Sequence, residues 1–208
     1  MPFAALAQAP AITSTERAIA TAVDSHNGDA LALLERLVNI NSGTMNFTGV
    51  RQVGDILRAQ FDTLGFKTRW IDGAPFHRAG HLIAEHPGTG PKILLIGHLD
   101  TVFEPNSPFQ RFERLNDSTA KGPGIIDMKG GDVILLYALR ALRDAGVLDK
   151  MNVTVVFDGD EEESGIWPRS TTSVMPSATT PSTSRTTSSS RRLRSEPRVL
   201  GTMQYVQR

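Results

Sequence analysis

The sequence predicts an α/β domain in which a mainly parallel sheet carries helices on both faces. Three observations support this prediction. Apolar residues recur at helical spacing in three segments, and glycines close two of these segments. Short apolar or alternating runs of strand length lie between them. Helical and strand patterns alternate along residues 13–165, which is typical of a parallel sheet.

Three helices are expected. The first begins near Thr13, which can form a capping box with Glu16, and Gly28 is expected to interrupt it. The second has its apolar residues on one face and ends at Gly65. The third covers residues 129–145, and its apolar positions again share one face.

Four strands are expected, at residues 66–70, 81–86, 92–97 and 152–157. The first alternates between polar and apolar residues, as a half-buried strand does. Residues 92–97 read Lys-Ile-Leu-Leu-Ile-Gly, so we expect this strand to be buried on both faces.

The composition excludes several classes of protein. The chain has 208 residues and no cysteine, which excludes a disulfide scaffold, thiol catalysis and cysteine-ligated metals. No apolar run reaches the roughly 18 residues that a membrane span needs. The net charge of zero combines two unlike parts, because residues 1–163 carry 15 basic and 21 acidic side chains, whereas residues 164–208 carry 7 arginines and one acid. The two parts therefore need separate interpretations.

The ends of the chain differ from the domain between them. Residues 1–12 are interpreted as a frayed terminus or as the remnant of a signal peptide, because Ala7-Gln8-Ala9 fits a small-x-small cleavage pattern. A signal remnant predicts a periplasmic or secreted protein, and a frayed terminus a cytoplasmic one.

The C-terminal segment, residues 166–208, is a Ser/Thr/Arg-rich tail. Nine serines and seven threonines occupy residues 170–195, so this segment is expected to be disordered. We interpret it as an out-of-frame translation that begins after Gly165, which the encoding DNA around that codon would test. The alternative is a genuine Arg/Ser-rich tail that binds a polyanion such as nucleic acid.

Three polar clusters follow or precede predicted elements at positions where open α/β sheets bind ligands. His98 and Asp100 come directly after one strand, Asp127 precedes the third helix, and the acidic run at 160–163 follows the last strand. Each cluster alone has an ordinary structural explanation: a buried histidine, a helix N-cap or a solvated acidic loop. The three together favour a hydrolytic metal site.

The chemistry of these residue types suits such a site. Side chains two apart in extended chain lie on one side, so Asp100 can accept the N–H of His98 and leave its other nitrogen for a metal ion. Asp127 follows a Gly/Pro turn and can bridge two cations. Neighbouring glutamates point in different directions, so one can bind metal while the other serves as general base.

Three motifs carry a family resemblance: HLDTVF at 98–103, GPGIIDMKGG at 122–131 and GDEEESG at 159–165. They resemble the metal-site motifs of the zinc metallopeptidase family of glutamate carboxypeptidases, acetylornithine deacetylases and succinyl-diaminopimelate desuccinylases. Glutamate carboxypeptidase is the most similar branch. The resemblance covers about residues 13–165 and implies part of a zinc-exopeptidase-like catalytic domain.

This resemblance implies two zinc ions. His98 would bind one ion, Glu162 the other, and Asp127 would bridge both. Asp100 would orient His98.

The resemblance also implies a reaction. The zinc ions would activate a water molecule that cleaves an amide bond beside a C-terminal glutamate-like residue, in a small peptide or an N-acyl amino acid. Glu161 would act as general base and pass the proton to the leaving amine. The acidic run offers Glu162 and Glu163 as a second base-and-ligand pair, so this assignment is open by one residue.

The sequence departs from the family pattern after Gly165. Family members continue with a further carboxylate and a late histidine, which complete the two zinc sites, and with an inserted domain for substrate contacts and homodimerisation. Residues 166–208 contain neither Asp nor His. Each zinc ion would keep two of its three expected protein ligands. The alternative function is therefore an inactive, truncated fragment that binds metal weakly or not at all.

The departure also predicts incomplete packing. Further strands and helices cover the sheet in the family, so we expect Val153, Val155 and Phe157 to be partly exposed here, and the chain to aggregate.

Overall fold

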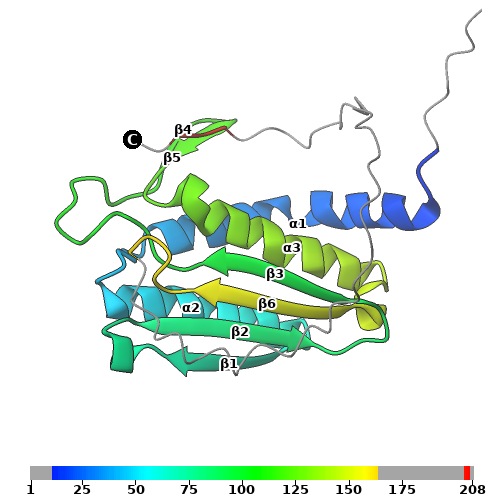
Figure 1. Cartoon of the computed structure of the whole chain (residues 1–208). Coiled ribbons are helices and arrows are strands. Elements are labelled where there is room, and N and C mark those ends of the chain that lie inside the picture. Colours follow the sequence, from blue (N-terminus) through cyan, green and yellow to red (C-terminus); the bar gives the residue numbers. More distant parts are fainter. Residues whose placement is uncertain (1–10, 164–203, 207–208) are drawn as a thin grey trace, which may run out of the picture.

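The fold is described from a computed structural model, which covers residues 11–163 and 204–206 (Figure 1). The helices are α1 (Ser14–Val38), α2 (Phe47–Thr63) and α3 (Gly130–Asp144). The strands are β1 (Lys67–Asp72), β2 (Gly80–His86), β3 (Lys92–His98), β4 (Glu113–Asn116), β5 (Thr119–Lys121), β6 (Asn152–Asp158) and β7 (Gln204–Val206). The predicted α/β class is confirmed, and every expected helix and strand is present within a few residues of its predicted bounds.

Local sequence signals account for the helix ends. The Thr13 side chain accepts from the Glu16 backbone N–H, and the Glu16 carboxylate accepts from the Thr13 N–H, which completes the predicted capping box of α1. Gly28 does not interrupt α1, because a glycine inside a helix costs only about 1 kcal/mol and packing outweighs that cost. Just beyond α2, Gly65 adopts a positive φ of 84° that favours glycine.

The main sheet has the strand order β1-β2-β6-β3 and is mixed, whereas the sequence pattern predicts a mainly parallel sheet. Only β3 and β6 run parallel; β1–β2 and β2–β6 are antiparallel. Segment length explains the difference. Residues 73–79 join β1 to β2 and are too few for the crossover of a dozen or more residues that parallel strands need. The long connection from β3 to β6 contains α3 and permits parallel pairing.

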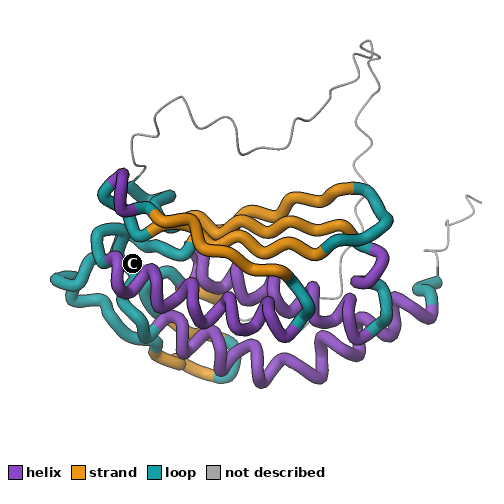
Figure 2. Tube along the Cα trace, turned by 90° about the horizontal axis from the view of Figure 1, so that it is seen from below, coloured by secondary structure: helices purple, strands orange, loops and turns teal. Residues whose placement is uncertain are grey.

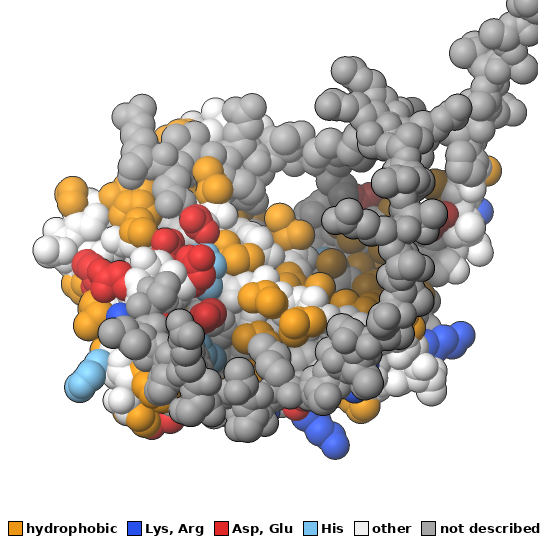
Figure 3. Space-filling model, in the orientation of Figure 1, with side chains coloured by type: hydrophobic (Ala, Val, Ile, Leu, Met, Phe, Trp, Pro, Cys, Tyr) orange, Lys and Arg blue, Asp and Glu red, His pale blue; other side chains and the backbone are white. Residues whose placement is uncertain are grey.

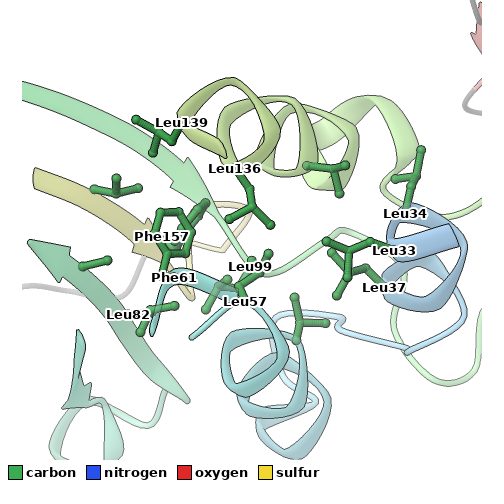
Figure 4. Close-up of a cluster of buried hydrophobic side chains, with 14 of the residues drawn as sticks. Leu33, Leu34, Leu37, Leu57, Phe61, Leu82, Leu99, Leu136, Leu139 and Phe157 are labelled. Atoms are coloured by element: carbon green, nitrogen blue, oxygen red, sulfur yellow. The ribbon is translucent and has the colours of Figure 1, made fainter. Parts of the chain in front are cut away.

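All three described helices pack on one face of this sheet, which corrects the expectation of helices on both faces (Figure 2). The core between the layers combines side chains from α2, α3 and the inward positions of β2 and β6 (Figure 4). Phe61, Leu82, Leu136 and Phe157 are all fully buried there. Phe61 and Phe157 meet edge to face, with ring centroids 5.6 Å apart.

The opposite face of the sheet exposes apolar side chains from β3 (Figure 3). Leu94 is 51% and Ile96 is 64% exposed, so the expectation that this strand is buried on both faces is wrong. Val153, Val155 and Phe157 are at most 1% exposed, so the expectation of their exposure is also wrong. The reason is the period of two in a strand: these three residues point toward the helices, and the side chains left open are the outward ones of β3.

Because this apolar face is exposed, we expect the purified chain to self-associate. Ile96→Glu should reduce the self-association, because it places a charge on the apolar face without changing the core. Sedimentation velocity at several concentrations measures the effect. Ile134→Glu is the matched control, since Ile134 is 65% exposed but lies on α3. A monodisperse wild-type monomer, or an equal response to both substitutions, would contradict the prediction.

A second, smaller sheet has the order β4-β5-β7. Gln204–Val206 runs parallel to Thr119–Lys121, so the predicted disorder is wrong for these three residues. They lie beyond the Ser/Thr-rich stretch at residues 170–195, and they include Tyr and Val, which favour strands. The other predictions for the tail, and those for residues 1–10, lie outside the described residues. None of the helices between residues 11 and 163 is long and apolar enough to span a membrane.

Candidate metal centre

The three predicted clusters meet at the end of the sheet where β3 and β6 terminate (Figure 1). His98 is the last residue of β3 and pairs in register with Asp158, the last residue of β6. Asp127 lies in the segment Ile125–Lys129 that leads into α3, and its own backbone is extended, with φ −123° and ψ 97°. Acidic side chains gather beside histidine on this part of the surface (Figure 3).

His98, Asp127 and Glu162 form the centre of this cluster. One ligand atom of each lies within 4.8 Å of the others, and His98 Nε2 is 2.9 Å from Asp127 Oδ1. Glu162 Oε1 is buried and has no hydrogen-bond partner among the described residues, as expected of an atom whose partner is a metal ion. One imidazole nitrogen with carboxylate oxygens is a donor set that zinc accepts, so the residues fit a divalent metal ion.

The two ring nitrogens of His98 have different surroundings. Nε2 faces the carboxylates of Asp127 and Glu161, the latter at 4.0 Å. Nδ1 lies 3.2 Å from the backbone oxygen of Asp100 and 3.4 Å from its Oδ1, so its proton is directed away from the cluster. Burial lowers the pKa of His98, but the hydrogen bonds with Asp100 and Asp127 outweigh it and raise the pKa to about 9 in the metal-free protein.

Asp100 is fully buried and connects three segments of the chain. Its Oδ1 accepts from the Glu161 backbone N–H at 3.2 Å, and its Oδ2 accepts from the Glu162 N–H at 3.1 Å. The Thr44 hydroxyl donates to Oδ2 at 2.7 Å. Burial raises the pKa of Asp100, but the hydrogen bonds from His98, Thr44 and Glu162 lower it by more than burial raises it. The pKa of Asp100 is therefore below its ordinary value. Asp100 therefore holds the acidic loop as well as His98.

The three adjacent glutamates have distinct environments. The Glu162 side chain points into the cluster, where burial and the negative charge of Asp127 raise its pKa. The Glu161 side chain is 57% exposed and near His98. Glu163 is exposed and contributes its backbone oxygen to Arg78. This geometry favours Glu161 and Glu162 over Glu162 and Glu163 as the pair of base and ligand.

Lys129, which stands two residues after Asp127, does not pair with it. Its side chain is buried, and Nζ donates to the backbone oxygens of Leu37 and Ile40 at 3.0 and 2.9 Å. These oxygens lie at the C-terminal end of α1, where a cation is favourable. Burial lowers the pKa of Lys129 to about 7, against a smaller opposing effect of Asp132. Lys129 thus anchors the turn to α1, and the Asp127 carboxylate stays available to a cation.

His81, Asp158 and Asp160 form a second group with metal-like spacing. Its donor atoms already have partners. His81 Nδ1 lies 2.8 Å from Asp158 Oδ1 and 3.3 Å from the Gly159 backbone nitrogen, and Arg78 Nε lies 3.6 Å from Asp160 Oδ2. The nearby guanidinium supplies the positive charge, so we interpret this group as an ion-pair network.

Sequence reasoning missed four polar residues around the centre: Thr44, Arg78, His81 and Asp132. No spacing pattern connects Thr44 or Arg78 to the motifs, because each meets its partner only through the fold. Asp132 is buried, neither carboxylate oxygen has a hydrogen-bond partner within the described part of the chain, and burial raises its pKa well above the usual value. A Cβ on Gly97 would lie 2.4 Å from Asp132 Oδ1, so this glycine makes room for the carboxylate.

Part of the chain matches a known peptidase family, and its fold matches solved structures. Residues 94–178 match the model of peptidase family M20/M25/M40; the match includes all three motifs and continues past Gly165, where the resemblance was expected to end. Carboxypeptidase G2 of Pseudomonas sp. (strain RS-16) is 35% identical over 137 residues, which are 65% of this chain and 33% of that protein. An uncharacterized metallohydrolase of Methanocaldococcus jannaschii is 31% identical over 134 residues, 64% of this chain and 32% of that protein.

Among solved structures, human carnosine dipeptidase 1 superimposes with a TM-score of 0.60 over 70% of this chain and 35% of that one. The sequence identity is 18%, so this likeness concerns the fold alone. The chain spans about a third of the length of the curated relatives it matches.

Proposed function

We propose that this chain is part of a zinc-dependent hydrolase that cleaves an amide bond beside a C-terminal glutamate-like residue, because residues 94–178 match the model of peptidase family M20/M25/M40. The observation that carries the proposal is the convergence of His98, Asp127 and Glu162 at one end of the sheet. The 35% identity to carboxypeptidase G2 supports a small peptide or an N-acyl amino acid as substrate.

In this proposal the chain holds zinc and moves a proton. His98 Nε2, Asp127 and Glu162 would hold the metal, and the Asp127 carboxylate is 55% exposed. Bound zinc supplies Lewis-acid polarisation and makes a water molecule more acidic.

The remaining residues have protein-based roles. Asp100 fixes the direction of the His98 ring by lying on the Nδ1 side. Glu161, whose carboxylate is open to solvent and 4.0 Å from His98 Nε2, takes a proton from the attacking water and gives it to the leaving amine.

A second candidate is that the 208-residue chain binds metal weakly and has no hydrolase activity of its own. A specific observation favours it. Within residues 11–163, the central cluster offers three candidate ligands, whereas two zinc ions with three protein ligands each would need five if they shared Asp127.

The two candidates differ in a hydrolysis assay. With added Zn²⁺, the purified 208-residue chain is expected to release no glutamate from folyl- or acyl-glutamate substrates. A longer protein, read in the frame that continues the family motifs, is expected to release it, and Glu161→Ala is expected to abolish the release. Activity of the 208-residue chain would refute the second candidate. No activity of the longer protein on any acyl-glutamate would refute the proposed substrate class.

The pKa of His98 gives a pH prediction for zinc binding. Since this pKa is about 9 and zinc binds the neutral ring, binding must release a proton. We expect the zinc affinity to rise about tenfold per pH unit from pH 6.5 toward 9 and then to level off. Calorimetric titrations at several pH values measure the slope. Asp127→Asn removes one cause of the raised pKa, so its plateau should begin at a lower pH; a pH-independent affinity would contradict the prediction.

A further inference from the structure

We propose that Arg78, two residues before β2, is a positioning residue that clamps the acidic loop of residues 159–163 against the sheet. The clamp sets the direction of Glu161 and Glu162. Its consequence for metal binding rests on the proposed function, but the clamp itself does not.

The Arg78 guanidinium contacts both ends of the loop. Nε and Nη2 donate to the backbone oxygen of Glu163 at 3.1 and 2.9 Å, and Nε lies 3.6 Å from the carboxylate of Asp160. The Arg78 side chain is only 15% exposed and that of Asp160 only 4%, so solvent screens this pair far less than a surface ion pair. The forked guanidinium thus spans the two residues that bracket Glu161 and Glu162.

A close backbone contact between Gly159 and Gly80 also fixes the position of the loop. Gly159 lies directly against Gly80, since a Cβ on Gly159 would come 2.0 Å from the Gly80 oxygen. Gly80 itself has a φ of 117°, which favours glycine, and lets the chain turn from Arg78 into β2 at this contact. His81 holds the Asp158 carboxylate on the same side.

The loop is therefore held from two sides. Asp100 binds the N–H groups of Glu161 and Glu162 from within, and Arg78 binds the Glu163 oxygen from the β2 side. With both in place, the Glu162 side chain faces His98 and the exposed Glu163 side chain is outside the cluster. Without Arg78, the Glu163 backbone oxygen loses its guanidinium donor and the buried Asp160 carboxylate loses a nearby positive charge. The hydrogen bonds of the Glu161 and Glu162 amides to Asp100 should therefore break more often.

The first test measures amide hydrogen exchange of Glu161 and Glu162 in the metal-free, full-length 208-residue chain. Arg78→Met is expected to accelerate their exchange roughly tenfold or more, the equivalent of losing one charge-assisted hydrogen bond. Arg78→Lys keeps the charge but not the fork, so it should give a smaller acceleration. Arg69→Met is the matched control, because Arg69 lies on the adjacent strand β1, pairs with Glu85 at 3.8 Å and is 47% exposed.

A second measurement links the clamp to the centre. The zinc affinity of Arg78→Met should fall about 10- to 100-fold, as it does when other residues that support metal ligands are removed, and Arg69→Met should match wild type. Unchanged exchange in both Arg78 variants, or equal acceleration in the Arg69 control, would overturn the clamp. Accelerated exchange in a chain whose wild type binds no zinc would support the clamp and refute zinc binding by the 208-residue chain.

Discussion

His98→Ala is expected to lower the zinc affinity of the chain by more than the 10- to 100-fold that loss of an outer partner costs. His98 supplies the only nitrogen in the central cluster, and its side chain is 6% exposed, against 55% for Asp127. The buried imidazole is therefore held more firmly by its surroundings than the exposed carboxylate of Asp127. Competition with a chromophoric chelator at pH 8 measures the change.

His77→Asn is the matched control. His77 is exposed, lies outside the cluster and has a φ of 56°, a conformation that asparagine tolerates. Its zinc affinity should equal that of wild type. Circular dichroism establishes whether His98→Ala is folded. A folded His98→Ala chain that binds zinc as tightly as His77→Asn would remove His98 from the metal site.

Local chemistry made much of the fold predictable. Two helix ends follow from residues close together in the sequence. The start of α1 has the capping box of Thr13 and Glu16, and the end of α2 is followed by Gly65, both as predicted. Strand direction and helix layering depend on connections and partners far along the chain, so they were harder to predict. Ile96 shows the limit: an apolar run predicts burial of the strand, but whether anything covers its outer face is a property of the whole fold.

The candidate site was predictable for a similar reason. His98 and Asp100 are two residues apart, and Glu161 and Glu162 are adjacent, so their relative directions follow from the local backbone. Thr44 is 56 residues from Asp100, and Arg78 is 85 from Glu163. No local pattern marks such contacts, and only the fold brings these partners together.

Asp100→Asn is expected to destabilise the metal-free chain by roughly 2–5 kcal/mol at pH 7. The buried carboxylate accepts hydrogen bonds from Thr44 and from the N–H groups of Glu161 and Glu162, and an amide presents only one acceptor oxygen. Its NH₂ group must face at least one of these donors, and the positive charge of His98 loses its buried partner. Urea unfolding measures the change, and Asp117→Asn, at a fully exposed position, should leave stability unchanged.

The pH dependence of this difference separates the charge of Asp100 from its shape. The folded-state pKa of Asp100 is below its ordinary value, so its charge contributes stability above the unfolded-state pKa of about 3.9 and loses that contribution as the pH falls through the folded-state pKa. The gap between wild type and Asp100→Asn should therefore shrink in acid. It should also narrow as the pH rises from about 6.5 toward 9, because Asp100 helps to raise the pKa of His98 to about 9 and that contribution to stability is lost when His98 deprotonates. A double-mutant cycle with Thr44→Val should also show coupling, because the Thr44 hydroxyl donates to the replaced carboxylate. Additive effects, or a gap that persists in strong acid, would mean that Asp100 stabilises the site by packing and not by its charge.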